Sequence, residues 1–299
     1  MHEDVVSIAS AGLKLYGVLG VPAGLRTQER RAAFLVLHGF GGNCESAGVI
    51  QPTKVLNESG YVTLRFDMRG CGKSGGEFGR VICLEQVEDL GNALEFLTSH
   101  PAVDPGRIGV IGSSFGGAVA IYAGATNPRI AAVISNGGWG HGERKFRGQH
   151  RTPEAWAKFT AMLAEGRAYR VRTGKSLMVP RADIVPIPGH VRQNLEEQNV
   201  QMLAINSVEM FPAETAQSML DFRAEEVVGN IAPRPLLLVH AANDSVTPTE
   251  QSIELFKRAG EPAELHLFSG HDHFLFNENS ARVWNLLRDW LGRYFPVRV

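Results

Sequence analysis

The chain has 299 residues and a formal net charge of −1, so it can bury a large core and carries no basic surplus for nucleic acid or an anionic membrane. No apolar run approaches the roughly 20 residues that cross a bilayer, and the acidic start, Met1-His2-Glu3-Asp4, lacks the regions of a signal peptide. Three cysteines without C-x-x-C spacing form no disulfide framework. We therefore expect a cytoplasmic globular protein that binds neither nucleic acid nor membrane.

The first 135 residues alternate between strand and helix patterns. Residues 5–9 and 13–19 predict an antiparallel hairpin, and the continuous apolar run 32–37 predicts a strand buried on both faces. Further strands are expected at 61–66, 107–111 and 130–135, with helices at 47–58 and 84–99 between them. This alternation predicts an α/β fold with a mainly parallel, doubly wound sheet.

The alternation stops at Gly137 and resumes at Pro235. The chain between these points reads as polar and helical, without clear strands. We interpret residues 139–230 as a helical cap insertion over the carboxyl-terminal edge of the sheet, and residues 1–138 and 231–299 as the core domain. The last part predicts strands at 235–240 and 263–268 and helices at 250–259 and 281–294.

A candidate nucleophile lies in Gly112-Ser113-Ser114-Phe115-Gly116, which has a strand before it and an apolar helix after it. Strand, sharp turn and helix form the context of a G-x-S-x-G nucleophile elbow, in which strained backbone presents the serine hydroxyl. A second match, Gly72-Lys73-Ser74-Gly75-Gly76, has no apolar helix directly after it. Ser114 is therefore the candidate, and Ser74 is not.

A serine nucleophile needs a base and a carboxylate that orients the base. Strand 236–239 leads into a loop with Asp244, and strand 263–268 leads into a loop with His271 and His273. The order Ser, Asp, His and the positions after strands agree with a triad at one edge of a parallel sheet.

A dinucleotide site is the rival interpretation, because Gly70-Cys71-Gly72-Lys73-Ser74-Gly75 is formally G-x-G-x-x-G after a strand. Gly76 and Gly79 follow where the helix should begin, so no helix N-terminus would face a pyrophosphate. The motif therefore does not indicate a nucleotide cofactor.

These motifs together resemble the α/β-hydrolase superfamily and, within it, bacterial cinnamoyl/feruloyl esterases and acyl-peptidase-like hydrolases. The matching pieces are residues 37–43, 67–74, 112–116, 243–248 and 270–273. The resemblance implies Ser114 as nucleophile, Asp244 as orienting acid and His273, which directly follows Asp272, as base in preference to His271. It also implies an oxyanion hole of the backbone N–H groups of Phe40 and Phe115, whose side chains are then free to line the pocket. No metal or organic cofactor is needed.

The candidate residues of the substrate pocket each have two interpretations. Trp139 and Trp156 are candidate pocket walls, with packing inside the cap as the alternative, and His271 is either a pocket contact or a partly exposed loop residue. His38 is interpreted as a structural histidine of the oxyanion loop. Basic residues that recur in the first half of the insertion either attract an anionic substrate or, as we prefer, form a solvated surface; they are Arg144, Lys145, Arg147, Arg151, Lys158, Arg167, Arg170, Arg172, Lys175, Arg181 and Arg192.

The implied activity is hydrolysis of a carboxylic ester of a small organic molecule by a serine hydrolase. An amidase or acyl-aminoacyl peptidase, a C–C bond hydrolase and an acyltransferase would use the same triad and remain alternatives. A non-catalytic receptor or scaffold of this fold is the non-enzyme alternative. A homodimer formed through the insertion or the terminal helix is also compatible with the sequence.

Overall fold

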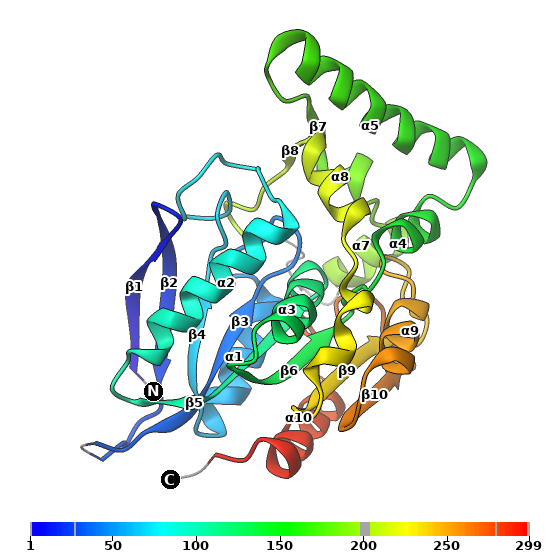
Figure 1. Cartoon of the computed structure of the whole chain (residues 1–299). Coiled ribbons are helices and arrows are strands. Elements are labelled where there is room, and N and C mark those ends of the chain that lie inside the picture. The colour runs from blue at the N-terminus through cyan, green and yellow to red at the C-terminus, as the bar shows by residue number, and fades with distance from the viewer. Residues whose placement is uncertain (1, 27, 198–203, 279, 298–299) are drawn as a thin grey trace.

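One eight-stranded sheet forms the centre of the computed structural model, which describes residues 2–26, 28–197, 204–278 and 280–297 (Figure 1). The spatial order is β1 (His2–Ser10), β2 (Leu13–Val21), β4 (Val62–Phe66), β3 (Arg31–Leu37), β5 (Val103–Ser113), β6 (Ile130–Asn136), β9 (Leu236–Ala241) and β10 (Ala263–Phe268). β2 runs antiparallel to both β1 and β4, and the remaining neighbours pair in parallel. The predicted mainly parallel sheet is therefore confirmed.

The apolar run of β3 reflects its place between β4 and β5. Leu35 pairs with Leu64 on one side and with Val110 on the other, and all three side chains are fully buried. A parallel strand covered by helices on both faces exposes neither of its alternating sets of side chains, so its sequence shows no polar alternation. The carboxyl ends of β3, β5, β6, β9 and β10 consequently reach the same edge of the sheet.

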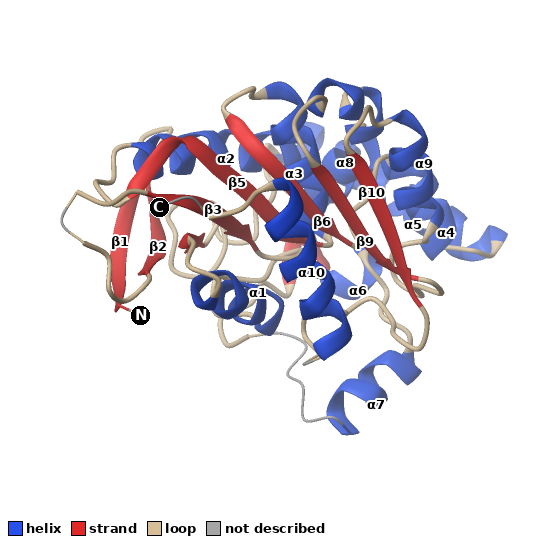
Figure 2. Cartoon of the chain, turned by 90° about the horizontal axis from the view of Figure 1, so that it is seen from below, coloured by secondary structure: helices blue, strands red, loops and turns tan. Residues whose placement is uncertain are grey.

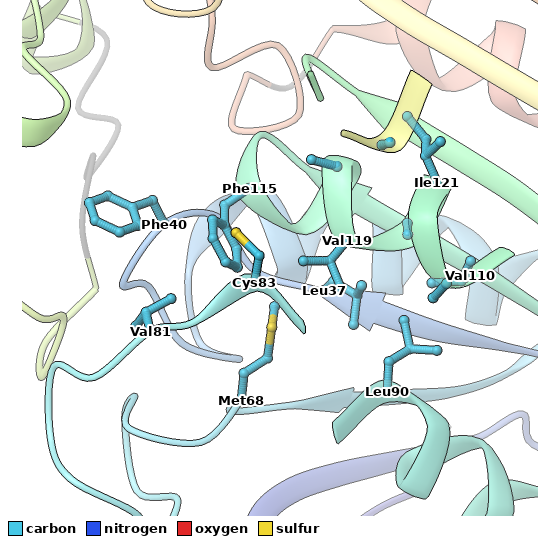
Figure 3. Packing of buried hydrophobic residues seen from close by; sticks show 14 of the residues in the cluster. Leu37, Phe40, Met68, Val81, Cys83, Leu90, Val110, Phe115, Val119 and Ile121 are labelled. Carbon is cyan, nitrogen blue, oxygen red and sulfur yellow. The ribbon is translucent and has the colours of Figure 1, made fainter. Parts of the chain in front are cut away.

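Helices cover both faces of the sheet (Figure 2). α1 (Ala47–Glu58) and α10 (Ala281–Tyr294) lie on one face, and α2 (Cys83–Thr98), α3 (Phe115–Thr126) and α9 (Glu250–Arg258) lie on the other. Each face has its own hydrophobic cluster. In the larger one, Leu37 and Val110 of the sheet gather with Leu90 of α2 and Val119 of α3 (Figure 3). This arrangement confirms the doubly wound fold.

The segment between β6 and β9 is mostly helical. It contains α4 (Gly142–Gln149), α5 (Pro153–Thr173), α6 (Arg181–Ile184), α7 (Gly189–Glu197), α8 (Ala213–Asp221) and the 3-10 turns η1 (Ala224–Glu226) and η2 (Val228–Ile231). Contrary to the expectation of no strands, β7 (Met178–Pro180) and β8 (Met210–Pro212) pair antiparallel. Each has three residues and ends in proline, which is too short for a period-2 pattern to register. The division into core and cap domains stays a prediction.

α5 projects from the rest of the molecule (Figure 1), and local sequence sets both of its ends. The Thr152 hydroxyl accepts a hydrogen bond from the backbone N–H of Ala155 (3.1 Å), Pro153 opens the first turn, and Gly174 ends the helix at a φ of +70°. Few of its side chains are buried. Neither α5 nor any other helix among the described residues is long and apolar enough to span a membrane.

Candidate active site

Ser114 lies in the sharp bend between β5 and α3, with a φ of +54° and a ψ of −114°. A side chain at Gly112 would overlap the backbone carbonyl group of Gly116, and a Cβ at Gly116 would lie 2.5 Å from the carbonyl oxygen of His38. The backbone N–H of Ser114 donates to the Asn136 carbonyl (2.7 Å). The two glycines therefore let strand and helix meet closely enough to hold Ser114 in a strained conformation.

The structure brings Ser114, His273 and Asp244 into one hydrogen-bonded series. His273 Nε2 lies 2.9 Å from Ser114 Oγ, and His273 Nδ1 lies 2.8 Å from Asp244 Oδ2. Asp244 comes from the loop after β9 and His273 from the loop after β10, two adjacent parallel strands. With the imidazole proton on Nδ1, Nε2 is free to accept the serine hydroxyl proton.

The Asp244 carboxylate is buried and fully engaged. Its Oδ1 accepts hydrogen bonds from the backbone N–H groups of Val246 (2.8 Å) and Thr247 (2.6 Å), which leaves Oδ2 for His273. Burial opposes ionisation, but the charge of His273 and hydrogen bonds from His240 and His273 outweigh it and hold the pKa of Asp244 well below its ordinary value. Asp244 is therefore ionised at neutral pH.

His240, at the end of β9, is a second partner of Asp244 that the sequence analysis did not identify. Its Nε2 lies 3.2 Å from Asp244 Oδ2 and 2.9 Å from the Thr247 carbonyl oxygen, and its Nδ1 lies 2.6 Å from Ser252 Oγ. A proton on Nε2 would point toward both oxygens while Nδ1 accepts from the Ser252 hydroxyl. A histidine that ends a strand four residues before the candidate acid was the signal available in the sequence.

The loop after β3 passes beside Ser114, and His38 holds it in shape. A Cβ at Gly39 would lie 3.8 Å from Ser114 Cβ. The buried His38 ring lies 2.8 Å from the Gly39 carbonyl through Nδ1, and Nε2 accepts from the Met68 N–H (3.1 Å). Burial lowers the pKa of His38, which favours the neutral ring that these two bonds require. These contacts fit the structural role expected for His38.

Phe40 and Phe115, the two residues expected to supply oxyanion-hole N–H groups, flank Ser114. Phe115 is the first residue of α3, where a backbone N–H has no acceptor within the helix. The Phe40 side chain lines the site cavity and stacks on Phe211 (ring centroids 4.2 Å apart). The Phe115 ring instead packs in the hydrophobic core (Figure 3), where its centroid lies 5.7 Å from that of the Trp139 ring. Of the two residues, Phe40 alone is among those that line the cavity. The N–H roles stay a prediction.

A cavity opens beside Ser114 and His273 at the edge where the sheet strands end. The β3–α1 loop, the elbow, the loop after β10 and the insertion all contribute to its walls. The lining residues are Gly39, Phe40, Gly42, Ser46, Gly48, Val49, Ser113, Ser114, Asn136, Arg181, Val185, Ile187, Val246, His273, Phe274 and Asn277. Arg181, Val185 and Ile187 come from the insertion, so this segment supplies part of the wall.

Trp139, Trp156 and His271, the candidate substrate-binding residues, do not line this cavity. Trp139 is buried against Phe115, because the chain turns inward directly after β6. Trp156 lies on α5 beside Phe159, with the guanidinium of Arg147 over its ring. The His271 ring turns toward Glu278, with 2.5 Å between Nδ1 and the carboxylate. The pocket interpretation of these three residues is therefore corrected; Arg181 and Asn277 are cavity residues that the sequence analysis did not single out.

Comparison with known proteins agrees with this architecture. The family model described as "Serine aminopeptidase, S33" matches residues 28–280. The polyketide transferase grgF of Penicillium sp is 27% identical over 299 residues, covering 98% of this chain and 97% of the relative.

Solved structures share the fold. The crystal structure of the α/β hydrolase GrgF has a TM-score of 0.80 at 24% identity, covering 98% of this chain and 99% of the other. Hypothetical protein PA2218 of Pseudomonas aeruginosa has a TM-score of 0.83 at 23% identity, with 98% and 94% covered. Est1E of Butyrivibrio proteoclasticus, solved with ferulic acid, has a TM-score of 0.67 at 20% identity, with 97% and 98% covered. The resemblance to the α/β-hydrolase superfamily is thus confirmed, and the chain belongs to the serine aminopeptidase S33 family of α/β hydrolases.

Proposed function

We propose that this protein is a serine hydrolase that cleaves a carboxylic ester of a small organic substrate through an acyl-enzyme on Ser114. The observation that carries the proposal is the series of hydrogen bonds from Ser114 Oγ through His273 to Asp244 at the wall of a cavity. A strained serine without a base would remain a weak nucleophile, and an unoriented histidine would be a poor base.

In the proposed mechanism, Ser114 Oγ attacks the ester carbonyl carbon while its proton passes to His273 Nε2. The buried Asp244 carboxylate stabilises the resulting imidazolium and keeps the ring oriented, because Oδ2 faces Nδ1 while Oδ1 is held by two backbone N–H groups. The N–H groups of Phe40 and Phe115 would stabilise the oxyanion, a contribution of several kcal/mol in enzymes of this kind.

Collapse of the tetrahedral intermediate breaks the ester C–O bond, and His273 returns its proton to the departing alkoxide. Water then enters, loses a proton to His273 and attacks the acyl-enzyme. A second tetrahedral intermediate releases the acid and restores the Ser114 hydroxyl. Both halves use the same base and the same oxyanion donors, so no further catalytic group is required.

An acyltransferase is the second candidate, and the full-length similarity to a protein named polyketide transferase favours it. An acyl-enzyme attacked by an alcohol, amine or thiol in place of water gives transfer instead of hydrolysis. Adding such acceptors and quantifying acid against transferred product by mass spectrometry separates the two outcomes. The family description equally keeps amide cleavage open, so anilides belong in the same assay.

The test is a panel of p-nitrophenyl esters of varied chain length, aryl esters and anilides, run on the wild type and Ser114→Ala. We expect ester turnover that Ser114→Ala lowers by at least about 1,000-fold, because the nucleophile is lost. Ser74→Ala is the matched control: Ser74 has the same motif, but its hydroxyl bonds the Asp67 carbonyl (2.5 Å) and it does not line the cavity. Turnover that survives Ser114→Ala would remove the nucleophile assignment, and no turnover by the wild type across the panel would favour the receptor or scaffold alternative.

A further inference from the structure

Arg181, the first residue of α6, places a guanidinium at the wall of the active-site cavity. Its Nη1 donates to the Phe40 carbonyl (2.5 Å), its Nη2 to the carbonyls of Gly41 (3.2 Å) and Val208 (2.5 Å), and its Nε to Val208 again (3.1 Å). All of these acceptors are neutral main-chain oxygens. The hydrogen bonds therefore fix the position of the side chain but do not neutralise its charge.

Several other basic residues of the insertion pair with carboxylates. Ion pairs there join Arg144 to Glu225, Lys158 to Asp183, Arg170 to Glu214 and Arg172 to Glu165. Among the described residues, no carboxylate lies within 4.0 Å of the Arg181 guanidinium, although the exposed Glu209 is close in the fold. These ion pairs offset part of the basic surplus noted in the sequence, whereas Arg181 lies at the cavity wall without a paired carboxylate among the described residues.

The Arg181 side chain is half-buried at the cavity wall. Desolvation lowers the pKa of Arg181 to about 10, and the residue still carries its charge at neutral pH. Buried charges in proteins are normally paired, because removing an ion from water costs several kcal/mol. A cation held only by carbonyls beside an open cavity therefore favours an anion that enters from the cavity.

The composition of the cavity wall supports this assignment. Among the described residues that line the cavity there is no Asp or Glu, and Arg181 supplies the only fixed charge. A guanidinium has five N–H donors, and the four hydrogen bonds above leave one Nη1–H for a ligand. The ring centroids of Phe40 and Phe211 lie 5.4 and 5.5 Å from the guanidinium carbon of Arg181. The two rings restrict the movement of the guanidinium group.

We propose that Arg181 selects substrates that carry a carboxylate, which it binds in the cavity while Ser114 attacks the ester carbonyl. The inference rests on the proposed function and specifies its substrate class: a half-ester of a dicarboxylic acid, or an ester whose leaving group bears the carboxylate. The competing role is purely positional, since Arg181 also clamps the carbonyls of Phe40 and Gly41 in the oxyanion loop. A clamp alone would serve charged and neutral substrates equally.

The kinetic test uses pairs of esters that differ only in carboxylate against carboxamide. On the acyl side, the mono-p-nitrophenyl ester of adipate is compared with that of adipamate; on the leaving-group side, 4-butyryloxybenzoate is compared with 4-butyryloxybenzamide. Uncatalysed rates are subtracted. For one of the two pairs we expect wild-type kcat/KM to favour the carboxylate by about 10- to 100-fold, the range of a hydrogen bond to a charged group.

Variants at position 181 separate selection from clamping. Arg181→Gln should bring the carboxylate-to-carboxamide ratio of kcat/KM to near 1, whereas Arg181→Lys should keep a ratio above 1 while lowering both values. Lys158→Gln is the matched control, because it removes the same charge from an exposed residue that pairs with Asp183 on α6. A ratio near 1 in the wild type for both pairs, or a ratio that Arg181→Gln leaves unchanged, would overturn the proposal.

Binding to Ser114→Ala keeps this test independent of turnover. Calorimetric titration of hexanoate and hexanamide should show tighter carboxylate binding by about 10-fold, and the additional change Arg181→Gln should remove it. If no ester is hydrolysed but this preference is found, the proposed function fails and the anion site stands. If esters are hydrolysed and the preference is absent, the anion site fails and the proposed function stands.

Discussion

At the scale of single residues, the two histidines of the loop after β10 have opposite environments. His273 faces Ser114 and Asp244, whereas His271 contacts Glu278 and lies outside the cavity wall. His273→Ala should therefore lower kcat by about 100- to 10,000-fold, the usual contribution of a general base. His271→Ala should change kcat by no more than a few fold. Steady-state kinetics on both variants, with melting temperatures as a folding check, distinguish them; equal losses would contradict the assignment of His273.

Ser114, Asp244 and His273 were recognisable as candidates in the sequence because each follows a strand in a motif whose spacing is local. Arg181 had no such signal, since it is one of twelve Lys and Arg residues between positions 139 and 230 and its partners, Phe40 and Gly41, lie about 140 residues away. Trp139 was misplaced for a related reason. A tryptophan directly after a strand can face a cavity or the core, and only the path of the following chain decides which.

At the scale of elements, α3 packs closely on β6 through Gly124. A Cβ at Gly124 would overlap Cγ2 of Val133, while Gly91 in α2 has open space around its Cβ position. In each helix, replacing glycine by alanine stabilises the helical conformation by about 1 kcal/mol, the difference in their helix propensities. We expect Gly91→Ala to raise the free energy of unfolding by about this amount. Gly124→Ala should instead lower it by about 1–3 kcal/mol, because the overlap forces the helix away from the sheet.

Urea unfolding of the two glycine variants provides the measurement. The pair is matched in residue type, substitution and helical location, so propensity cancels in their difference. A Gly124→Ala variant as stable as Gly91→Ala would mean that α3 can shift on the sheet without cost. The close packing of α3 on β6 would then not be required for stability.

The elements of the core were predictable because strands buried on both faces and helices with one apolar face have strong periodic patterns. The elements at 32–37, 47–58, 130–135 and 263–268 all lie within one residue of β3, α1, β6 and β10. β7 and β8 have no such pattern, because each has only three residues, one of them proline, which is too few to show an alternation of apolar and polar side chains. Tertiary pairing alone makes them strands.

At the scale of the whole molecule, the cavity is a product of distant segments. The β3–α1 loop, the elbow and the loops after β9 and β10 converge because parallel strands end at one edge of the sheet. The alternation of strand and helix patterns in the sequence is enough to predict this convergence. How the insertion covers that edge depends on non-local contacts, such as the Val208 N–H donating to the Gly41 carbonyl (2.8 Å). The convergence of Ser114, Asp244 and His273 was therefore predictable from the sequence, whereas the cavity residues that the insertion supplies were not.

Lys145, on α4 of the insertion, adds a pH-dependent contribution to the stability of the whole chain. Its side chain is 1% exposed, and Nζ lies 4.9 Å from the ring centroid of Trp139 and 4.3 Å from that of Phe146. It donates to Gln149 Oε1 (2.7 Å), and no carboxylate pairs with it among the described residues. Burial lowers the pKa of Lys145 to about 7 from the lysine value of 10.5.

The sign of the resulting effect follows from proton linkage. Between pH 7 and 10.5 the unfolded chain holds a proton at Lys145 that the folded chain lacks, so this residue makes the free energy of unfolding rise with pH. Below pH 7 both states are protonated and the penalty on folding is constant at its largest. Lys145→Met should thus be more stable than the wild type by a few kcal/mol (~2–5) near pH 6.5, and the gap should shrink toward pH 10.

Urea unfolding of both proteins at pH 6.5, 8 and 9.5 measures this gap. Ionisation of the buried thiols affects both proteins equally and cancels in the difference between their free energies of unfolding. Lys54→Met, at an exposed position on α1, is the control and should show no such trend. A Lys145→Met difference that stays constant with pH would mean that the buried amine keeps its proton in the folded state.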